Sequence, residues 1–176
     1  LDDDLSSRFN QIARDRFDVR IANGTKLEKT ANGVRLELDN GESVEAEAIL
    51  VATGRTPNGD QMDLDKAGIE LLADARVSTD EFGRTTAEGV WALGDVSSPY
   101  TLKHVANAET RAVQHNLLHP EDLRPLPHDN VPAAIFTHPQ IATVGLTEKQ
   151  AQQKGFDVTV KVQNFGDVAY GWAMED

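Results

Sequence analysis

The feature that most constrains the fold is a cluster of prolines between residues 119 and 132. Four of the seven prolines in the chain lie there, interspersed with charged residues. Each proline fixes its φ angle and lacks a backbone N–H, so neither a regular helix nor a central strand can run through this stretch. The cluster therefore predicts an extended connection between domains, with a long amino-terminal part before it and a shorter part after it.

The amino-terminal part predicts a helix followed by a β-meander. Apolar residues recur at helical spacing over residues 4–17, with acidic residues first and Arg14 and Arg16 near the end, as the helix dipole favours. Three Asn-Gly pairs then separate short alternating stretches, which is typical of hairpins. The run that begins at Val44 becomes continuously apolar over residues 49–52, which predicts a strand covered on both faces.

A candidate binding site follows in the middle of the chain. We expect strands at residues 76–79 and 90–93, the second of which ends in Gly94-Asp95. Open α/β sheets bind ligands at the carboxyl ends of their strands, and a glycine there lets a ligand approach the backbone. A helix predicted over residues 102–118 begins nearby, and its amino terminus would stabilise an electron-rich group. Asp95 is therefore a candidate for binding a ribose or polyol hydroxyl, and a turn-forming role stays open.

The carboxyl-terminal part predicts an α+β unit. Short strands are expected at residues 133–136 and 141–144, followed by a helix at 147–154 with Thr147 as its N-cap, and by an alternating strand at 156–162. Roughly forty residues make a small core for an independent domain, so further strands of this unit are expected outside the chain.

Composition excludes several classes of protein. The 176 residues include 17 Lys plus Arg against 29 Asp plus Glu, with a net charge of −12 and no basic cluster, so no nucleic acid partner is expected. No apolar run approaches the roughly 18 residues of a membrane helix, so no membrane association is expected. The absence of cysteine excludes disulfides, zinc-thiolate sites and a cysteine nucleophile within these residues. The start at Leu1, without Met or a signal peptide, indicates an internal fragment of a longer polypeptide.

Four ordered motifs resemble the flavoprotein disulfide reductases, the family of glutathione reductase, dihydrolipoamide dehydrogenase and mercuric reductase. The motifs are ATGRTPN at 52–58, GVWALGD at 89–95, TLKHVANAE at 101–109 and PAAIFTHPQIATVGLTEKQA at 132–151. The resemblance covers essentially the whole chain. Two runs, GDVSSPYTLKHVAN at 94–107 and VQNFGDVAYGWAMED at 162–176, are most similar to the members that reduce mycothione, the disulfide of mycothiol.

The resemblance implies an α/β fold, with partial Rossmann-like FAD- and NAD(P)-binding domains followed by the start of an α+β dimerisation domain. Residues 1–52 would be the carboxyl-terminal part of the nicotinamide-nucleotide-binding domain, and residues 53–128 the returning part of the FAD-binding domain. Residues 129–176 would be the amino-terminal part of the interface domain. Three partial domains are thus expected.

The resemblance also implies cofactor-binding residues. Asp95, which follows Gly94, matches the aspartate that binds the flavin ribityl chain, in agreement with the carboxylate placement argued above. Gly54 matches the glycine whose backbone approaches the nicotinamide nucleotide, whereas Arg55 is expected to brace its loop through a salt bridge. The backbone beside the pyrimidine edge of the isoalloxazine would come from Thr101, Leu102, Lys103 and His104. There the helix amino terminus would stabilise negative charge on reduced flavin.

The activity implied by the resemblance is the reduction of mycothione, a small-molecule disulfide. The enzyme would be a cytoplasmic homodimer that binds FAD and uses NADPH as its reductant, with NADH as the alternative. Hydride would pass to flavin, and electrons would then pass to a redox dithiol. The chain lacks that dithiol, both glycine-rich turns and the catalytic His-Glu pair, so it is assigned no catalytic residue and is expected to be inactive alone. Dihydrolipoamide dehydrogenase or mercuric reductase relatives, and a non-catalytic dimerisation or binding module, are the alternatives.

Four histidines are assigned to no site. His138 precedes a proline, as the catalytic base of the family does, but no carboxylate follows closely, so a structural role is expected. His115 and His119 stand four residues apart without the acid of a His-Glu-x-x-His site, and no metal is expected. His128, in the proline-rich stretch, is expected to be exposed.

Overall fold

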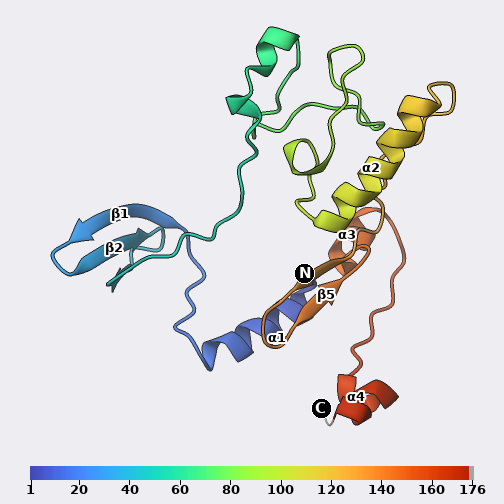
Figure 1. Ribbon diagram of the computed structural model, residues 1–176. Helices are drawn as coiled ribbons and strands as arrows, with labels where there is room; N and C mark the ends of the chain where they lie inside the picture. The colour runs from blue at the N-terminus through green and yellow to red at the C-terminus, as the bar shows by residue number, and fades with distance from the viewer. Residues whose placement is uncertain (175–176) are drawn as a thin grey trace. The chain divides into compact units, whose positions relative to one another are not determined.

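The computed structural model describes residues 1–174 and divides into two compact units (Figure 1). Unit 1 combines residues 1–16 with the chain from residue 130 onward, and unit 2 consists of residues 17–129. The last two residues of the expected interface segment, 175–176, lie outside the described residues.

Unit 1 contains short helices and one β-hairpin. Its elements are α1 (Asp3–Arg14), β4 (Ala133–Ile135), β5 (Ile141–Thr143), α3 (Glu148–Gln153), the 3-10 helix η4 (Phe165–Asp167) and α4 (Ala169–Met174). The predicted amino-terminal helix is confirmed: α1 has acidic residues in its first turn and Arg14 in its last. Strands β4 and β5 pair antiparallel with Ala134 opposite Ala142, which confirms both predicted strands. His138, in the connection between these strands, is exposed.

The start of α3 confirms Thr147 as its N-cap. The Thr147 hydroxyl accepts a hydrogen bond from the Gln150 N–H at 3.3 Å, and Gln150 Oε1 accepts one from the Thr147 N–H at 3.0 Å. This capping box satisfies backbone N–H groups that the start of a helix leaves without intrahelical partners. Asp2 Oδ1 accepts the Glu148 N–H at 2.8 Å, which ties the start of α1 to the start of α3.

Unit 2 begins with the predicted β-meander, drawn in blue in Figure 1. Three antiparallel strands pair in chain order: β1 (Gly24–Thr30), β2 (Gly33–Leu38) and β3 (Ser43–Ala46). Arg35 on β2 lies opposite Glu45 on β3, and its Nε donates to Glu45 Oε1 at 2.7 Å. Leu38, at the end of β2, is buried.

The remainder of unit 2 contains one long helix, α2 (Lys103–Leu118), close to the predicted range of 102–118. Three 3-10 helices precede it: η1 (Gly59–Gln61), η2 (Leu64–Ala67) and η3 (Gly94–Val96). The buried residues of α2 are Val105, Glu109, Val113 and Asn116. Their spacing of three to four places them on one face of the helix. Two of these four buried residues are polar, so the helix is held in unit 2 by hydrogen bonds as well as by apolar contacts.

Several predicted strands do not form. The runs at 49–52 and 156–162 lie outside any strand, and residues 76–79 and 90–93 contribute only single bridges, at Val77 and Trp91. A strand is held by a continuous ladder of hydrogen bonds to a neighbouring strand, and no such ladder forms for these runs within residues 1–174. Residues 76–79 and 90–93 make only a few backbone hydrogen bonds around their single bridges. The continuously apolar run is correspondingly uncovered, with Leu50 89% exposed.

The proline-rich stretch is not a free spacer. The backbone N–H of Leu126 donates to Glu81 O at 2.8 Å, and that of Arg124 donates to Asn116 Oδ1 at 2.7 Å. Residues 119–129 therefore pack onto unit 2, and the prediction of an extended connection between domains is wrong for this part of the stretch. The proline content predicted the irregular backbone of this stretch, but it did not predict the hydrogen bonds to Glu81 and Asn116 that hold the stretch in place.

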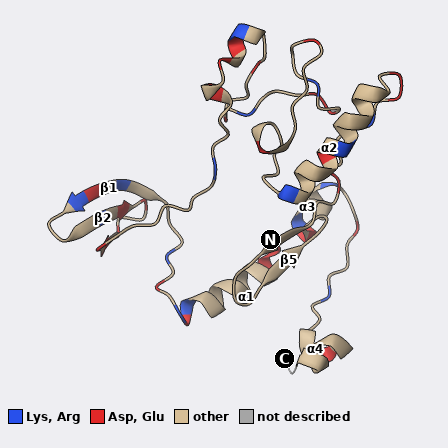
Figure 2. Ribbon diagram, in the orientation of Figure 1, with Lys and Arg blue, Asp and Glu red and all other residues tan. Residues whose placement is uncertain are grey.

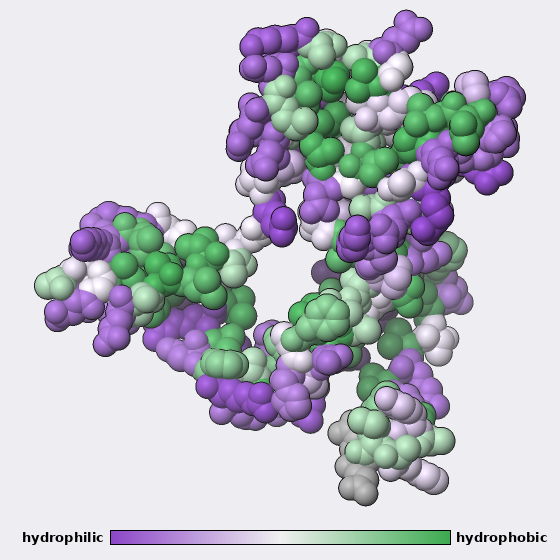
Figure 3. Space-filling model, viewed as in Figure 1, coloured by the Kyte–Doolittle hydropathy of each residue, from purple (hydrophilic) through white to green (hydrophobic). Residues whose placement is uncertain are grey.

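The chain has a net negative charge, but its acidic and basic residues are mixed along the surface. Residues of both signs are interspersed along the ribbon (Figure 2). Hydrophobic side chains reach the surface in several places (Figure 3). The exposed hydrophobic residues include Phe136 and Trp172, which are 87% and 74% exposed. In the described part of the chain, no helix has the length and apolar character needed to cross a bilayer.

Candidate functional site

The Gly94–Val96 turn gives the predicted site its backbone geometry. Gly94 is buried and has a φ of +70°, a left-handed conformation that favours glycine. Its carbonyl oxygen accepts hydrogen bonds from the N–H groups of Ser97 and Ser98 at 3.0 and 2.7 Å. The Val77 N–H donates to Val96 O at 2.8 Å, which anchors the turn to the preceding segment. Asp95 remains exposed on the outside of this fixed turn.

The amino terminus of α2 follows the turn after six residues. Leu102 is the N-cap, and its carbonyl oxygen accepts hydrogen bonds from the Val105 and Ala106 N–H groups, each at 3.1 Å. Lys103 and His104 are the first two helical residues, and no acidic side chain lies in the first turn. The positive end of the helix dipole is therefore not neutralised by an acid of that turn, and a negatively charged or electron-rich ligand would be stabilised there.

A groove lies beside the turn. It has a volume of about 490 Å³, and an adjoining hollow of about 190 Å³ shares five of its lining residues. The shared residues are Arg55, Thr56, Pro57, Asp95 and Thr101. The structure therefore brings two of the predicted flavin-binding residues, Asp95 and Thr101, to the same groove. Lys103 and His104 are not among the residues that line it.

Two arginines and two aspartates line the groove, and one arginine is paired with one aspartate there. Arg76 Nε donates to Asp74 Oδ2 at 2.7 Å, and this hydrogen bond from the guanidinium holds the pKa of Asp74 below its ordinary value. Arg55 forms no ion pair with any residue of the described range 1–174, so the expected bracing salt bridge is not made within these residues. Arg55 and Asp95 both line the groove.

The groove fits part of a flavin nucleotide chemically. A ribityl chain presents hydroxyl groups, for which the Asp95 carboxylate is an acceptor and the Thr101 hydroxyl both donor and acceptor. Gly94, at positive φ, is buried and does not line the groove, so its part is to shape the turn that carries Asp95. Gly54 is exposed with a φ of +122°, and no atom lies within 4 Å of the position a Cβ would occupy. Its surroundings therefore leave room for a ligand to approach the backbone.

Sequence reasoning missed the residue that supports the turn from below. The Gly94 N–H donates to Glu109 Oε2 at 2.6 Å, and the side chain of Glu109 is completely buried. His128 Nε2 lies 2.6 Å from the other carboxylate oxygen of Glu109, and the His128 side chain is 30% exposed. The expectation that His128 is solvent-exposed is therefore wrong. A signal was present in the sequence, because Glu109 lies four residues from both Val105 and Val113 on the apolar face of α2.

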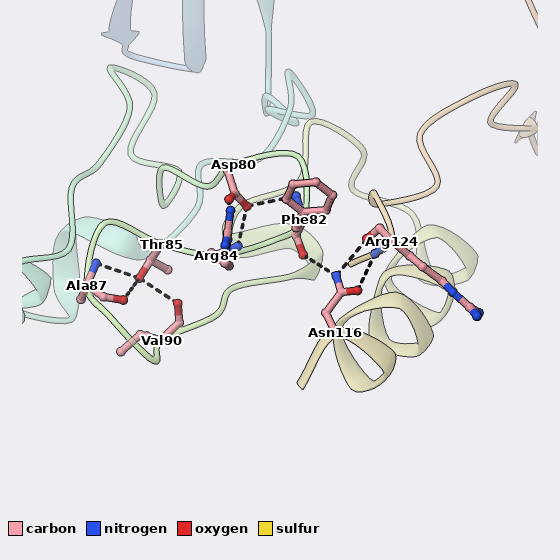
Figure 4. Close-up of polar contacts among 8 residues, drawn as sticks. All are labelled: Asp80, Phe82, Arg84, Thr85, Ala87, Val90, Asn116 and Arg124. Atoms are coloured by element: carbon pink, nitrogen blue, oxygen red, sulfur yellow. Dashed lines mark hydrogen bonds and ion pairs between the residues drawn. The ribbon is translucent and has the colours of Figure 1, made fainter. Parts of the chain in front are cut away.

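A second polar network supports the far end of α2 (Figure 4). The Asn116 amide donates to Phe82 O at 3.1 Å and to Arg124 O at 2.9 Å, and Asn116 Oδ1 accepts the Arg124 N–H. In the neighbouring turn, Asp80 Oδ1 accepts the N–H groups of Phe82 and Arg84 at 3.0 and 2.9 Å, and Arg84 Nε donates to Asp80 Oδ2 at 2.6 Å. These contacts hold the turn at residues 80–84 and the backbone at Arg124 against α2, and none of these residues lines the groove.

His115 is also used structurally. Its Nε2 lies 2.8 Å from the carbonyl oxygen of Asp122, just beyond the carboxyl end of α2, and its ring contacts that of His119 at 4.7 Å between centroids. Within residues 1–174, no group of three or more His, Cys, Asp or Glu side chains is arranged to hold a metal ion.

Comparison with protein families supplies an independent assignment. Residues 1–112 match the family described as pyridine nucleotide-disulphide oxidoreductase, and residues 131–176 match the dimerisation domain of the same family. The expected α/β fold class, with an FAD-binding domain followed by a dimerisation domain, is confirmed by these matches.

Individual relatives agree with this assignment. The chain is 53% identical over 180 aligned residues to mycothione reductase of Mycobacterium tuberculosis, covering 99% of this chain and 39% of the relative. It is 33% identical to dihydrolipoyl dehydrogenase of the same organism, over 90% of this chain and 35% of the relative. The chain thus spans about two fifths of the length of the curated relatives it matches.

Solved structures give the same result. The HOCl-induced flavoprotein disulfide reductase RclA from Escherichia coli superimposes with a TM-score of 0.84 at 27% identity, over 99% of this chain and 40% of that chain. LpdA from Mycobacterium tuberculosis superimposes with a TM-score of 0.82 at 25% identity, over 99% of this chain and 38% of that chain. The chain therefore belongs to the pyridine nucleotide-disulphide oxidoreductases, the family of the flavoprotein disulfide reductases.

Proposed function

We propose that this chain is part of an FAD-dependent, NADPH-using oxidoreductase that reduces mycothione to mycothiol. The observation that carries the proposal is the groove in which Asp95 and Thr101 lie together, beside a turn that leads into the amino terminus of α2. The 53% identity to mycothione reductase supports mycothione as the substrate over lipoamide, for which the identity is 33%. The family resemblance also favours a cytoplasmic location for the enzyme.

Each residue of the site has a physical role in this proposal. Asp95 would accept hydrogen bonds from ribityl hydroxyls. The backbone of Thr101, Leu102, Lys103 and His104, at the amino terminus of α2, would lie beside the pyrimidine edge of the flavin and stabilise negative charge there. Gly54 would let the nicotinamide nucleotide approach its backbone. When bound, FAD supplies the capacity to accept hydride from the nicotinamide and to pass electrons to a dithiol.

The remaining parts of the activity would be contributed by other segments of the full-length enzyme. Residues 1–176 contain no cysteine, so the redox dithiol cannot come from them, and we propose that they are inactive in isolation. The segment from residue 131 matches a dimerisation domain, which supports a homodimer as the active assembly.

The flavin assignment is tested with the full-length enzyme. Replacing Asp95 by Ala removes the acceptor, so the flavin-to-protein ratio after desalting should fall well below that of the unaltered enzyme. Asp65→Ala is the matched control, because Asp65 is an exposed aspartate of η2 away from the groove-lining residues. Equal flavin content in the two variants would exclude the proposed role of Asp95.

The substrate is tested by turnover. Mycothione, glutathione disulfide, lipoamide and Hg²⁺ should be compared at matched concentrations, each with NADPH and with NADH. The proposal requires the highest kcat/KM for mycothione with NADPH. Preference for lipoamide with NADH would instead place the enzyme with the dihydrolipoyl dehydrogenases, and preference for Hg²⁺ with the mercuric reductases.

A further inference from the structure

The segment from Gly94 to Thr101 presents the proposed flavin-binding groups, and it is supported from inside the unit by one buried carboxylate. Glu109 is completely buried, and its Oε2 accepts the Gly94 N–H at 2.6 Å. Side chains on a helix tilt toward its amino terminus, so Glu109, the seventh residue of α2, reaches back over the preceding turn. Ala106 of that turn lies against Gly94, 3.5 Å from the position a Cβ would occupy.

The second oxygen of the same carboxylate supports the other end of the segment. Glu109 Oε1 lies 2.6 Å from His128 Nε2. The His128 ring packs edge-on against the ring of Tyr100, with centroids 5.3 Å apart, and the Tyr100 hydroxyl donates to the His128 carbonyl oxygen at 3.4 Å. Tyr100 directly precedes Thr101. Glu109 is therefore connected to the segment at Gly94 directly and at Tyr100 through His128.

We propose that Glu109 is a positioning residue for the flavin site, holding the Gly94–Thr101 segment so that Asp95 and the amino terminus of α2 face the cofactor together. This inference rests on the proposed flavin site. Glu109 itself is buried beneath the segment and does not line the groove. Its effect on flavin must therefore pass through the backbone of Gly94 and the placement of Asp95.

Two substitutions that keep a side chain of about the size of Glu109 distinguish the effect of losing the hydrogen bond from the effect of losing the charge. Glu109→Gln keeps an oxygen acceptor at the position of Oε2, whereas Glu109→Leu removes it and leaves the Gly94 N–H buried without a partner. A buried group deprived of its hydrogen bond costs enough to change an equilibrium by about five- to 150-fold. We expect the Leu variant to raise the Kd for FAD at least about tenfold, and the Gln variant to raise it by about threefold or less.

Asn116→Ala provides a matched control for loss of stability. Asn116 is also completely buried on α2 and also bridges backbone groups, but its partners are Phe82 and Arg124 and not the Gly94 turn. It should lower the melting temperature of the apoprotein while changing the Kd for FAD by less than about threefold. The circular dichroism of bound flavin should change in the Leu variant and remain unchanged in the Asn116 variant.

A double-mutant cycle with Asp95→Ala tests the route, using flavin titration of full-length apoprotein. Because Glu109 acts through the placement of Asp95, the tenfold effect of Glu109→Leu should shrink to about threefold or less when Asp95 is already Ala. A full tenfold effect in both backgrounds would overturn the positioning role and leave the flavin site intact. If Asp95→Ala alone binds FAD normally, the flavin assignment fails and the positioning role fails with it. If the Leu variant does not fold, a tenfold rise in the Kd for FAD of the Gln variant would overturn the role of the carboxylate as hydrogen-bond acceptor.

Discussion

Asn116 is the side chain whose removal should most clearly destabilise unit 2. It is completely buried, and its amide makes three hydrogen bonds: two as donor, to Phe82 O and Arg124 O, and one as acceptor, from the Arg124 N–H (Figure 4). Each such bond contributes about 1 kcal/mol net, so Asn116→Ala should lower the free energy of unfolding by about 3 kcal/mol. The loss is that large because the partly buried backbone groups of Phe82 and Arg124 lose their partner when the amide is removed.

The assay is urea unfolding of the full-length protein, followed by the fluorescence of Trp91, which lies in the same unit, after every other tryptophan of that protein, Trp172 among them, has been replaced by Phe. Gln114→Ala is the matched control, because Gln114 is an exposed residue of the same helix and alanine is at least as good a helix former. That control should stay within about 0.5 kcal/mol of the unaltered protein. A loss below about 1 kcal/mol for Asn116→Ala would refute the reasoning.

Asn116→Asp provides a second arm with a distinct pH dependence. The substitution keeps an acceptor for the Arg124 N–H but turns a buried carboxylate oxygen toward the carbonyl oxygens of Phe82 and Arg124. Burial and repulsion should raise the pKa of this carboxyl in the folded state, so its protonated form fits the site better. Relative to the unaltered protein, the variant should therefore be less destabilised at pH 4 than at pH 7.

Three further predictions concern other contacts. Burial alone would raise the pKa of Asp80, but hydrogen bonds from the Arg84 N–H, the Arg84 guanidinium and the Phe82 N–H together hold this pKa below its ordinary value. The resulting stabilisation of the fold is present above the ordinary aspartate pKa of about 3.9 and is lost as pH falls through the lower pKa of the folded state. Asp80→Asn should therefore flatten the pH dependence of the unfolding free energy in that acid range, and an unchanged slope would contradict the assignment. Thr147→Ala should destabilise α3 by about 1 kcal/mol by removing its cap, which hydrogen exchange of the Gln150 amide would report, and Thr147→Ser should restore the protection. His138 is exposed, so His138→Ala should leave the turnover of the full-length enzyme within about twofold, whereas a loss of several orders of magnitude would identify it as catalytic.

The sequence predicted well those elements whose signals are local. The helical spacing of α1 and α2, the Asn-Gly turns of the meander and the Thr147 cap are each specified by residues close together in the chain, and all are present. The motif resemblance likewise predicted the family, which the matches over residues 1–112 and 131–176 confirm. The assignment of Asp95 to flavin stays a prediction, although its place in the groove beside Thr101 supports it.

The sequence by itself determined that helices form near residues 4–17, 102–118 and 147–154, where the Asn-Gly hairpins turn, and which family the chain belongs to, because those features depend on neighbouring residues or on ordered motifs. Only the tertiary structure decided which apolar runs become strands, because a strand requires a partner that periodicity does not specify. It also decided that His128, in a proline-rich stretch, pairs with Glu109, 19 residues earlier, beneath Gly94. A buried carboxylate needs compensating donors, and these come from distant parts of the chain that meet only when it folds.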